Sequence, residues 1–205
     1  SVTSCTTKVR RMMIDRLRLS CAALALTLLT GCASNDTAVL QRLDPETGVT
    51  IKRASAPIVM YRDMSANSAF GRDYVYVGPI QVNNMGQRAY FLWLGIWGSS
   101  DSAERGRKMD DFEAVVLYAD GEPLSLEVKG WTPGSIGVSE DVYVKPVASA
   151  LDGYYRVTVD QMRLIAESRD LELRAGATRP QRYVPWDSPE GSSQALIAFL
   201  RELDW

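Results

Sequence analysis

Apolar runs along residues 39–203 predict a chain that is mainly β. The clearest runs are 73–82 and 88–97, which are rich in β-branched and aromatic residues and flank the turn-forming stretch 83–87. In the second run both alternating faces are apolar, so this strand is expected to lie centrally with cover on each side. Pro79 interrupts the first run and predicts a sheet edge or a bulge at that point.

Shorter runs of the same kind predict further strands. Two hairpins are expected, one over 39–43 and 49–53 and one over 112–118 and 124–131, each across a turn that contains glycine. Single strands are predicted at 58–61, 142–147, 154–159 and 171–174. Loops are predicted at 64–72, 132–140 and 179–189, and a loop or one short helical turn at 99–111.

Two segments have helical spacing of their apolar residues instead. The first is a short helix over 160–167, which Asp160 would cap. The second begins at Pro189 after the capping residue Ser188 and has one apolar face, made by Leu196, Ile197, Leu200 and Leu203. The expected fold is therefore α+β but mainly β: an antiparallel sandwich or roll with one short helix and a C-terminal helix. A single domain is predicted over 39–205.

The run 19–29 differs from all of these, because eleven consecutive residues carry no charge and five basic residues with only one acid precede them. This pattern predicts a secretory signal peptide, since it is shorter than the roughly 20 residues that span a bilayer. A buried helix is disfavoured because the apolar residues are continuous and form no stripe. A start at Met12 or Met13 would give an ordinary length, so residues 1–11 are not expected in the native protein. The pair Arg10-Arg11 leaves a twin-arginine export signal as an alternative, which the following residues fit poorly.

The residues Leu29-Thr30-Gly31-Cys32 end this run. They resemble the lipobox of bacterial lipoproteins: an aliphatic residue, a small residue, Gly or Ala, then Cys. The resemblance implies cleavage between Gly31 and Cys32, a diacylglycerol thioether on Cys32 and acylation of the new amino group. At roughly 0.8 kcal/mol for each buried methylene, these chains would hold the mature protein on the lipid bilayer without spanning it. Residues 32–38 would be a short tether, and residues 33 and 34, by analogy with enteric lipoproteins, favour the outer membrane facing the periplasm.

Composition narrows the possible functions further. Removing residues 1–31 takes away five of 23 basic residues and one of 25 acidic ones, which leaves 18 against 24. A nucleic-acid partner needs a basic surface and is therefore not expected. The chain has no histidine, which excludes Ser-His-Asp and Cys-His catalysis and His-based zinc sites. Cys32 would be the only cysteine left in the mature chain and would carry the lipid, so no internal disulfide and no catalytic thiol are expected.

Candidate sites beyond Cys32 are few. The aromatic residues of the two longest strands could form a stacking platform, although aromatic residues in strands more often belong to a core: Tyr74, Tyr76, Tyr90, Phe91, Trp93 and Trp97. Trp131 and Trp186, in predicted loops, are candidate contacts for a ligand or a partner protein. The acidic residues between 101 and 113 lack the glycine bend of a calcium loop, so no metal and no cofactor are expected. The paired carboxylates Glu140 and Asp141 are not by themselves a glycosidase site.

Two roles follow from these observations, and neither is enzymatic. The first is a membrane-anchored lipoprotein of the bacterial cell envelope with a structural or interaction role, whose partner would be another envelope protein or peptidoglycan. The alternative is a module that binds cell-wall glycan or a small apolar ligand through loop tryptophans or a cavity. An exposed aromatic surface would favour the alternative.

Overall fold

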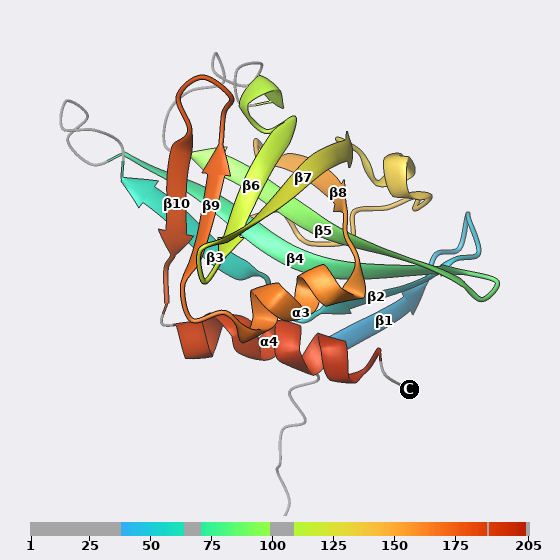
Figure 1. Ribbon diagram of the computed structural model, residues 1–205. Helices are drawn as coiled ribbons and strands as arrows, with labels where there is room; N and C mark the ends of the chain where they lie inside the picture. The colour runs from blue at the N-terminus through green and yellow to red at the C-terminus, as the bar shows by residue number, and fades with distance from the viewer. Residues whose placement is uncertain (1–37, 64–70, 99–108, 188, 204–205) are drawn as a thin grey trace, which may run out of the picture. The chain divides into compact units, whose positions relative to one another are not determined.

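Antiparallel pairing joins all the strands of the described chain into one sheet (Figure 1). The computed structural model describes residues 38–63, 71–98, 109–187 and 189–203. The strands are β1 (Val39–Leu43), β2 (Thr50–Ala54), β3 (Ile58–Asp63), β4 (Arg72–Asn84), β5 (Gln87–Gly98), β6 (Ala114–Ala119), β7 (Glu122–Gly130), β8 (Leu151–Arg156), β9 (Leu171–Ala175) and β10 (Gln181–Pro185). The helices are the 3-10 helix η3 (Pro133–Ile136), α3 (Val159–Glu167) and α4 (Pro189–Arg201). The mainly β, antiparallel fold class predicted from the sequence is confirmed.

The sheet closes on itself. Neighbouring strands follow the order β4, β3, β10, β9, β6, β7, β8, β5, and β5 pairs back with β4 along its whole length. The hairpin β1–β2 adds to the second half of β4, where Thr50–Arg53 pair with Ile80–Asn83. The strands of the ring therefore have an inner face and an outer face, and alternate residues of each strand belong to opposite faces.

Strand β4 changes partner halfway along one edge. Strand β3 pairs with it as far as Val77, and β2 pairs with it from Ile80 onward. Gly78 and Pro79 lie between the two partners. No strand pairs with Pro79 on this edge, so the N–H that proline lacks is not needed there. The prediction of a local sheet edge at Pro79 is confirmed, and the same gap admits the ring of Tyr143, described below.

The inner face of the ring holds the main core. It is formed by the inward residues of the strands, among them Val75 and Val77 of β4 and Leu92, Leu94 and Ile96 of β5. Helices α3 and α4 contact each other and extend this core with their apolar faces: Met162, Ile165, Ala166, Leu196, Phe199 and Leu200. Figure 1 shows both helices lying across one end of the strands.

A second core lies on the outer face of β2, β4, β5 and β8. Residues 131–150, here called the covering segment, connect β7 to β8 and pack four apolar side chains onto this face. Ile136, Val138, Val142 and Tyr143 of the covering segment contact a patch made by Val49, Ile51, Ile80, Val82, Phe91, Trp93 and Tyr154. Both faces of β5 are therefore buried from Phe91 to Ile96, as its two apolar faces predicted.

Two-residue turns join the longest hairpins. Met85 and Gly86 between β4 and β5, and Asp120 and Gly121 between β6 and β7, all have positive φ. This is the geometry of a turn whose twist matches that of the flanking strands, and asparagine, aspartate and glycine adopt it most readily. Asp120 also accepts hydrogen bonds from the backbone N–H groups of Arg169 and Asp170, at 2.9 Å each, which ties this turn to the loop after α3.

Three local predictions are wrong. The stretch 179–189 is not entirely irregular, because Gln181–Pro185 form β10, whose pairing with both β9 and β3 completes the ring. The strand predicted over 142–147 is not formed: no strand is assigned to these described residues, and the neighbours Val142 and Tyr143 are both buried, which breaks the alternation of a strand. Helix α3 is capped by Thr158, not Asp160: Thr158 and Gln161 exchange side-chain and backbone hydrogen bonds in a capping box.

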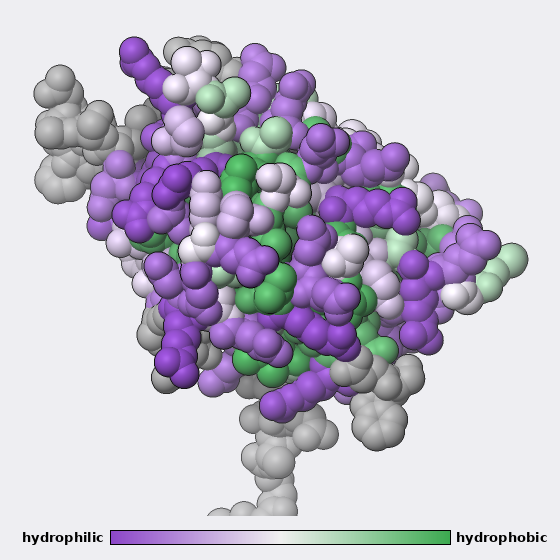
Figure 2. All heavy atoms as spheres, viewed as in Figure 1, coloured by the Kyte–Doolittle hydropathy of each residue, from purple (hydrophilic) through white to green (hydrophobic). Residues whose placement is uncertain are grey.

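Other expectations need smaller changes or lie outside the described residues. The strand expected at 154–159 runs from Leu151 to Arg156. Ser188 and most of the loops expected at 64–72 and 99–111 lie outside the described residues, as do all residues up to 37. No helix of the described chain is long and apolar enough to cross a membrane. Figure 2 shows that the face carrying β6 and β7 is mostly polar, with a narrow hydrophobic strip between charged side chains.

Candidate functional site

Five aromatic side chains gather on the outer face of four neighbouring strands. Tyr61 of β3, Tyr74 of β4 and Trp97 of β5 occupy one row, because Tyr61 pairs with Tyr74 and Tyr74 pairs with Trp97 in the ladder. Tyr76 lies two residues further along β4 on the same face. Trp186 is the residue after β10. Its backbone N–H donates a 2.9 Å hydrogen bond to the backbone carbonyl of Val59, which holds this residue next to β3. These five residues are here called the aromatic platform.

The rings of the platform contact one another. Tyr74 and Trp97 are stacked, with ring centres 4.6 Å apart and planes 15° from parallel. The rings of Trp186 and Tyr61 are arranged edge to face with their centres 5.2 Å apart. The ring centres of Trp186 and Tyr74 are 6.1 Å apart, and those of Tyr76 and Trp97 are 6.5 Å apart. The four tyrosine and tryptophan residues in the strands are half-buried, and Trp186 is 48% exposed. Edge-to-face and offset contacts of this kind fix the rings in defined orientations.

Charged residues lie at one margin of the platform. The guanidinium carbon of Arg72 is 5.3 Å from the centre of the Tyr61 ring and 5.1 Å from that of Trp186. Arg72 also pairs with Asp63 at 2.8 Å, whereas the pair of Arg62 and the buried Asp73 lies on the inner face, where Arg62 is 5.5 Å from the centre of the Tyr183 ring. The charge of Arg72 is thus matched by a carboxylate from the adjacent strand, so this margin offers hydrogen-bonding groups without a large net charge.

The platform borders the covering segment. Tyr143 of the covering segment stacks on Trp93, with ring centres 4.7 Å apart, and its hydroxyl donates a 2.8 Å hydrogen bond to the carbonyl of Pro79. Burial raises the pKa of Tyr143, and the nearby Arg53 guanidinium only partly offsets this, so the hydroxyl keeps its proton. A Cβ on Gly78 would come within 2.5 Å of the Tyr143 ring, which shows that glycine makes room for the ring here.

An ion pair between the buried Asp152 and the partly exposed Lys145 supports the same border between the platform and the covering segment. Asp152 of β8 is 5% exposed; it accepts a 3.0 Å hydrogen bond from the indole nitrogen of Trp93 and pairs with Lys145 of the covering segment at 2.5 Å. Because a buried carboxylate is costly without partners, this arrangement holds both Trp93 and the covering segment in place.

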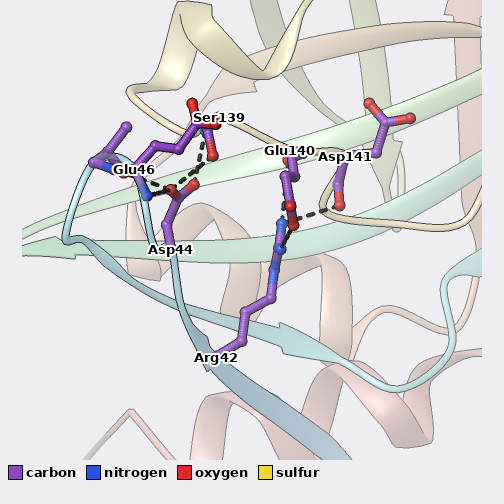
Figure 3. A network of polar contacts seen from close by, with 7 residues as sticks. Arg42, Asp44, Glu46, Ser139, Glu140 and Asp141 are labelled. Carbon is purple, nitrogen blue, oxygen red and sulfur yellow. Dashed lines mark hydrogen bonds and ion pairs between the residues drawn. The ribbon is translucent and has the colours of Figure 1, made fainter.

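A second polar network joins the β1–β2 turn to the covering segment (Figure 3). The carboxylate of Asp44 is buried and accepts hydrogen bonds from the N–H groups of Glu46 and Thr47, at 3.1 Å, and from the N–H and hydroxyl of Ser139, at 2.7 Å. Burial alone would raise the pKa of Asp44, but these four hydrogen bonds outweigh it and hold the pKa well below its usual range. Asp44 is therefore a structural anion.

The paired carboxylates Glu140 and Asp141 belong to the same network. Arg42 of β1 forms an ion pair with Glu140 at 2.5 Å and donates to the backbone carbonyls of both residues. Figure 3 shows the Arg42 side chain extending from β1 to these two residues, while the Asp141 side chain points away from it. The two carboxylates do not face each other across a cleft, so this pair does not have the arrangement of a glycosidase site.

The candidate residues from the sequence are thus separated by the fold. Trp186, Trp97, Tyr74 and Tyr76 come together on the platform, whereas Phe91 and Trp93 belong to the second core. Tyr90 and Trp131 pack against the main core, away from the platform. Cys32 and the cleavage residue Gly31 lie outside the described residues. Sequence patterns gave no sign of Tyr61, because only the register of β3 against β4 places it beside Tyr74.

The described chain offers no grouping of three or more cysteine and acidic side chains suited to a metal ion. Part of the acidic stretch 101–113 lies outside the described residues; within the described part, Asp111 accepts a hydrogen bond from Gln181 at 3.2 Å. No protein-family model, curated protein or solved structure matches the chain. The arrangement that remains in the described residues is an exposed, rigid aromatic surface with polar groups at its margin, which can bind a ligand but contains no nucleophile activated by a base.

Proposed function

We propose that the chain is a lipoprotein of the bacterial cell envelope whose domain acts by binding, while acylated Cys32 holds it at the outer membrane. The observation that carries this proposal is the sequence Leu29-Thr30-Gly31-Cys32 behind an uncharged run and a basic flank. Strand β1 begins at Val39, so six residues separate Cys32 from the folded domain. A tether of this length supports a domain held close to the membrane surface.

The anchor is tested by fatty-acid labelling in bacteria that express the full chain. Cys32→Ser removes the thiol that would carry the diacylglycerol, so incorporation of labelled fatty acid should disappear and the leader should remain uncleaved. Cys21→Ser is the matched control, because it removes a cysteine of the same leader that lies outside the lipobox, and labelling should continue. Unchanged labelling of the Cys32→Ser variant would disprove the anchor.

The alternative role, a module that binds cell-wall glycan or a small apolar ligand, is favoured by one specific observation. The aromatic platform leaves Trp186 half-exposed beside four further rings that are held in place by stacking. Ligand sites combine such apolar surfaces with a few polar groups that set orientation. The two roles are compatible, because an anchored protein can bind the wall; binding of the purified protein to isolated peptidoglycan tests the second one.

A further inference from the structure

The outer face of β4 from Tyr74 to Val82 and of β5 from Ala89 to Trp97 is apolar, but the described chain covers only part of it. On β4 the outward residues are Tyr74, Tyr76, Gly78, Ile80 and Val82, since alternate residues share a face. The covering segment packs on the part from Gly78 to Val82. From Gly78 toward Tyr74 the outward residues change from buried to aromatic and half-buried, and of these Tyr76 still packs against the second core. The less covered part is the aromatic platform.

The shape of the platform is set before any ligand arrives. Its residues lie on adjacent strands of a closed sheet, and the Tyr74–Trp97 stack and the Trp186–Tyr61 edge contact hold the rings against one another. From β10 to β5 the platform crosses three strand-to-strand steps, which is about 14 Å. A rigid surface of this extent binds without a large cost for ordering side chains.

The chemistry of the platform favours a sugar over a lipid or a polyanion. Aromatic side chains match a ligand that has an apolar face and a polar edge, whereas an acyl chain needs no ring stacking. The charged margin consists of the pair Arg72–Asp63, so it offers donors and acceptors but little net positive charge. The whole chain is also acidic, with a net charge of −2. A pyranose ring offers one face of C–H groups edged by hydroxyl groups, and thus meets both requirements.

We propose that the aromatic platform binds the sugar rings of the cell-wall glycan, the β-linked chain of N-acetylated amino sugars. The inference rests on the proposed envelope location for the source of the glycan, and on the platform for the site itself. Trp186 contributes the most accessible part of the surface, and Tyr61, Tyr74 and Trp97 extend it across the sheet. The acetamido groups add a methyl group for stacking and a carbonyl oxygen that arginine can bind.

The test measures co-sedimentation of the purified, lipidated full chain, in mild detergent, with isolated peptidoglycan sacculi. Trp186→Ala and Tyr61→Ala each remove one ring and should weaken binding about tenfold, as expected for the loss of one desolvated aromatic contact. Soluble oligomers of β-linked N-acetylglucosamine should compete with the sacculi. Thermal unfolding of each variant shows whether the fold is kept; Trp186 lies after a strand end and is half-exposed, so its removal should leave the fold intact.

The matched control is Tyr118→Ala. Tyr118 is likewise a half-buried tyrosine of a strand, with Arg174 4.4 Å from its ring centre, but it lies on β6, outside the platform. Binding to sacculi should be unchanged in this variant. If the unmodified chain does not bind sacculi, or if the platform variants bind as well as Tyr118→Ala, the inference is wrong.

Other occupants of the platform give different results. If Trp186→Ala lowers binding to protein-free phospholipid vesicles, or abolishes self-association of the chain, and sacculus binding stays the same, the platform faces a membrane or a second copy and the glycan inference fails. Acylation of Cys32 is measured separately, by fatty-acid labelling. Platform variants should keep the label, and Cys32→Ser should lose the label but still bind sacculi, so each proposal can fail without the other.

Discussion

Substitution of Gly78 by alanine should loosen the border between the covering segment and the aromatic platform. Gly78 lies on the outer face of β4, where a Cβ would come within 2.5 Å of Cζ and 2.6 Å of Cε2 of Tyr143. Ordinary contacts begin at 3.4 Å, so the ring would have to retreat by about 1 Å. It cannot simply rotate away, because it is stacked on Trp93 and bound to the carbonyl of Pro79.

The expected cost combines three contributions. Inserting a methyl group into a well-packed site costs about 1–3 kcal/mol. Losing the hydrogen bond between Tyr143 and Pro79 adds about 1 kcal/mol, because the carbonyl is then buried without its partner. Replacing glycine by alanine in a strand returns about 0.5–1 kcal/mol through the lower entropy of the unfolded chain. The free energy of unfolding should therefore fall by about 1–3.5 kcal/mol, against the roughly 5–15 kcal/mol typical of a domain.

Urea unfolding followed by tryptophan fluorescence measures this change as a lower midpoint with an unchanged slope. Gly134→Ala is the matched control, because a Cβ at that position would find its nearest neighbouring atom 3.8 Å away, and its midpoint should stay the same or rise. In a Tyr143→Leu background, which removes the ring, Gly78→Ala should lose most of its effect. A Gly78→Ala midpoint equal to that of the unmodified chain, or an effect that persists without Tyr143, would refute a clash with the Tyr143 ring as the cause.

Two further predictions concern helix α3 and Asp44. Thr158→Ala should lower the free energy of unfolding by about 1 kcal/mol, because it breaks the capping box, whereas Asp160→Ala should change it by less than about 0.5 kcal/mol; the opposite order in urea unfolding would contradict the assignment of the cap. The folded-state pKa of Asp44 lies below its unfolded value of 3.8, so its carboxylate stabilises the fold above about pH 4, and this contribution is lost as pH falls below that value toward the lower folded-state pKa. Asp44→Asn should therefore unfold at lower urea than the unmodified chain at pH 7, with the gap narrowing in acid; a gap that stays constant with pH would show that the charge of Asp44 is not what stabilises the turn.

Local sequence patterns predicted most of the strands, because the apolar pattern that marks a strand lies within the residues of that strand. The central position of β5 followed from its two apolar faces, and the hairpins β4–β5 and β6–β7 followed from glycine at their turns. The prediction failed for residues 181–185, where Tyr183 is the only fully buried residue of a polar, proline-flanked strand. At 142–147 a strand was predicted but is not formed. Val142 and Val144 alternate as in a strand, but no strand of the described chain pairs with this segment.

The sequence by itself determined the targeting prediction, the acidic charge, the absence of histidine and the mainly β class, because these depend on composition and on patterns among residues close together in the chain. Only the tertiary structure decided that the sheet closes, because β10 must pair with β3, more than 100 residues earlier in the chain. The same long-range pairing decided which aromatic residues are exposed. The register places Tyr61, Tyr74 and Trp97 in one row, while the covering segment buries Trp93, although all four look alike in the sequence.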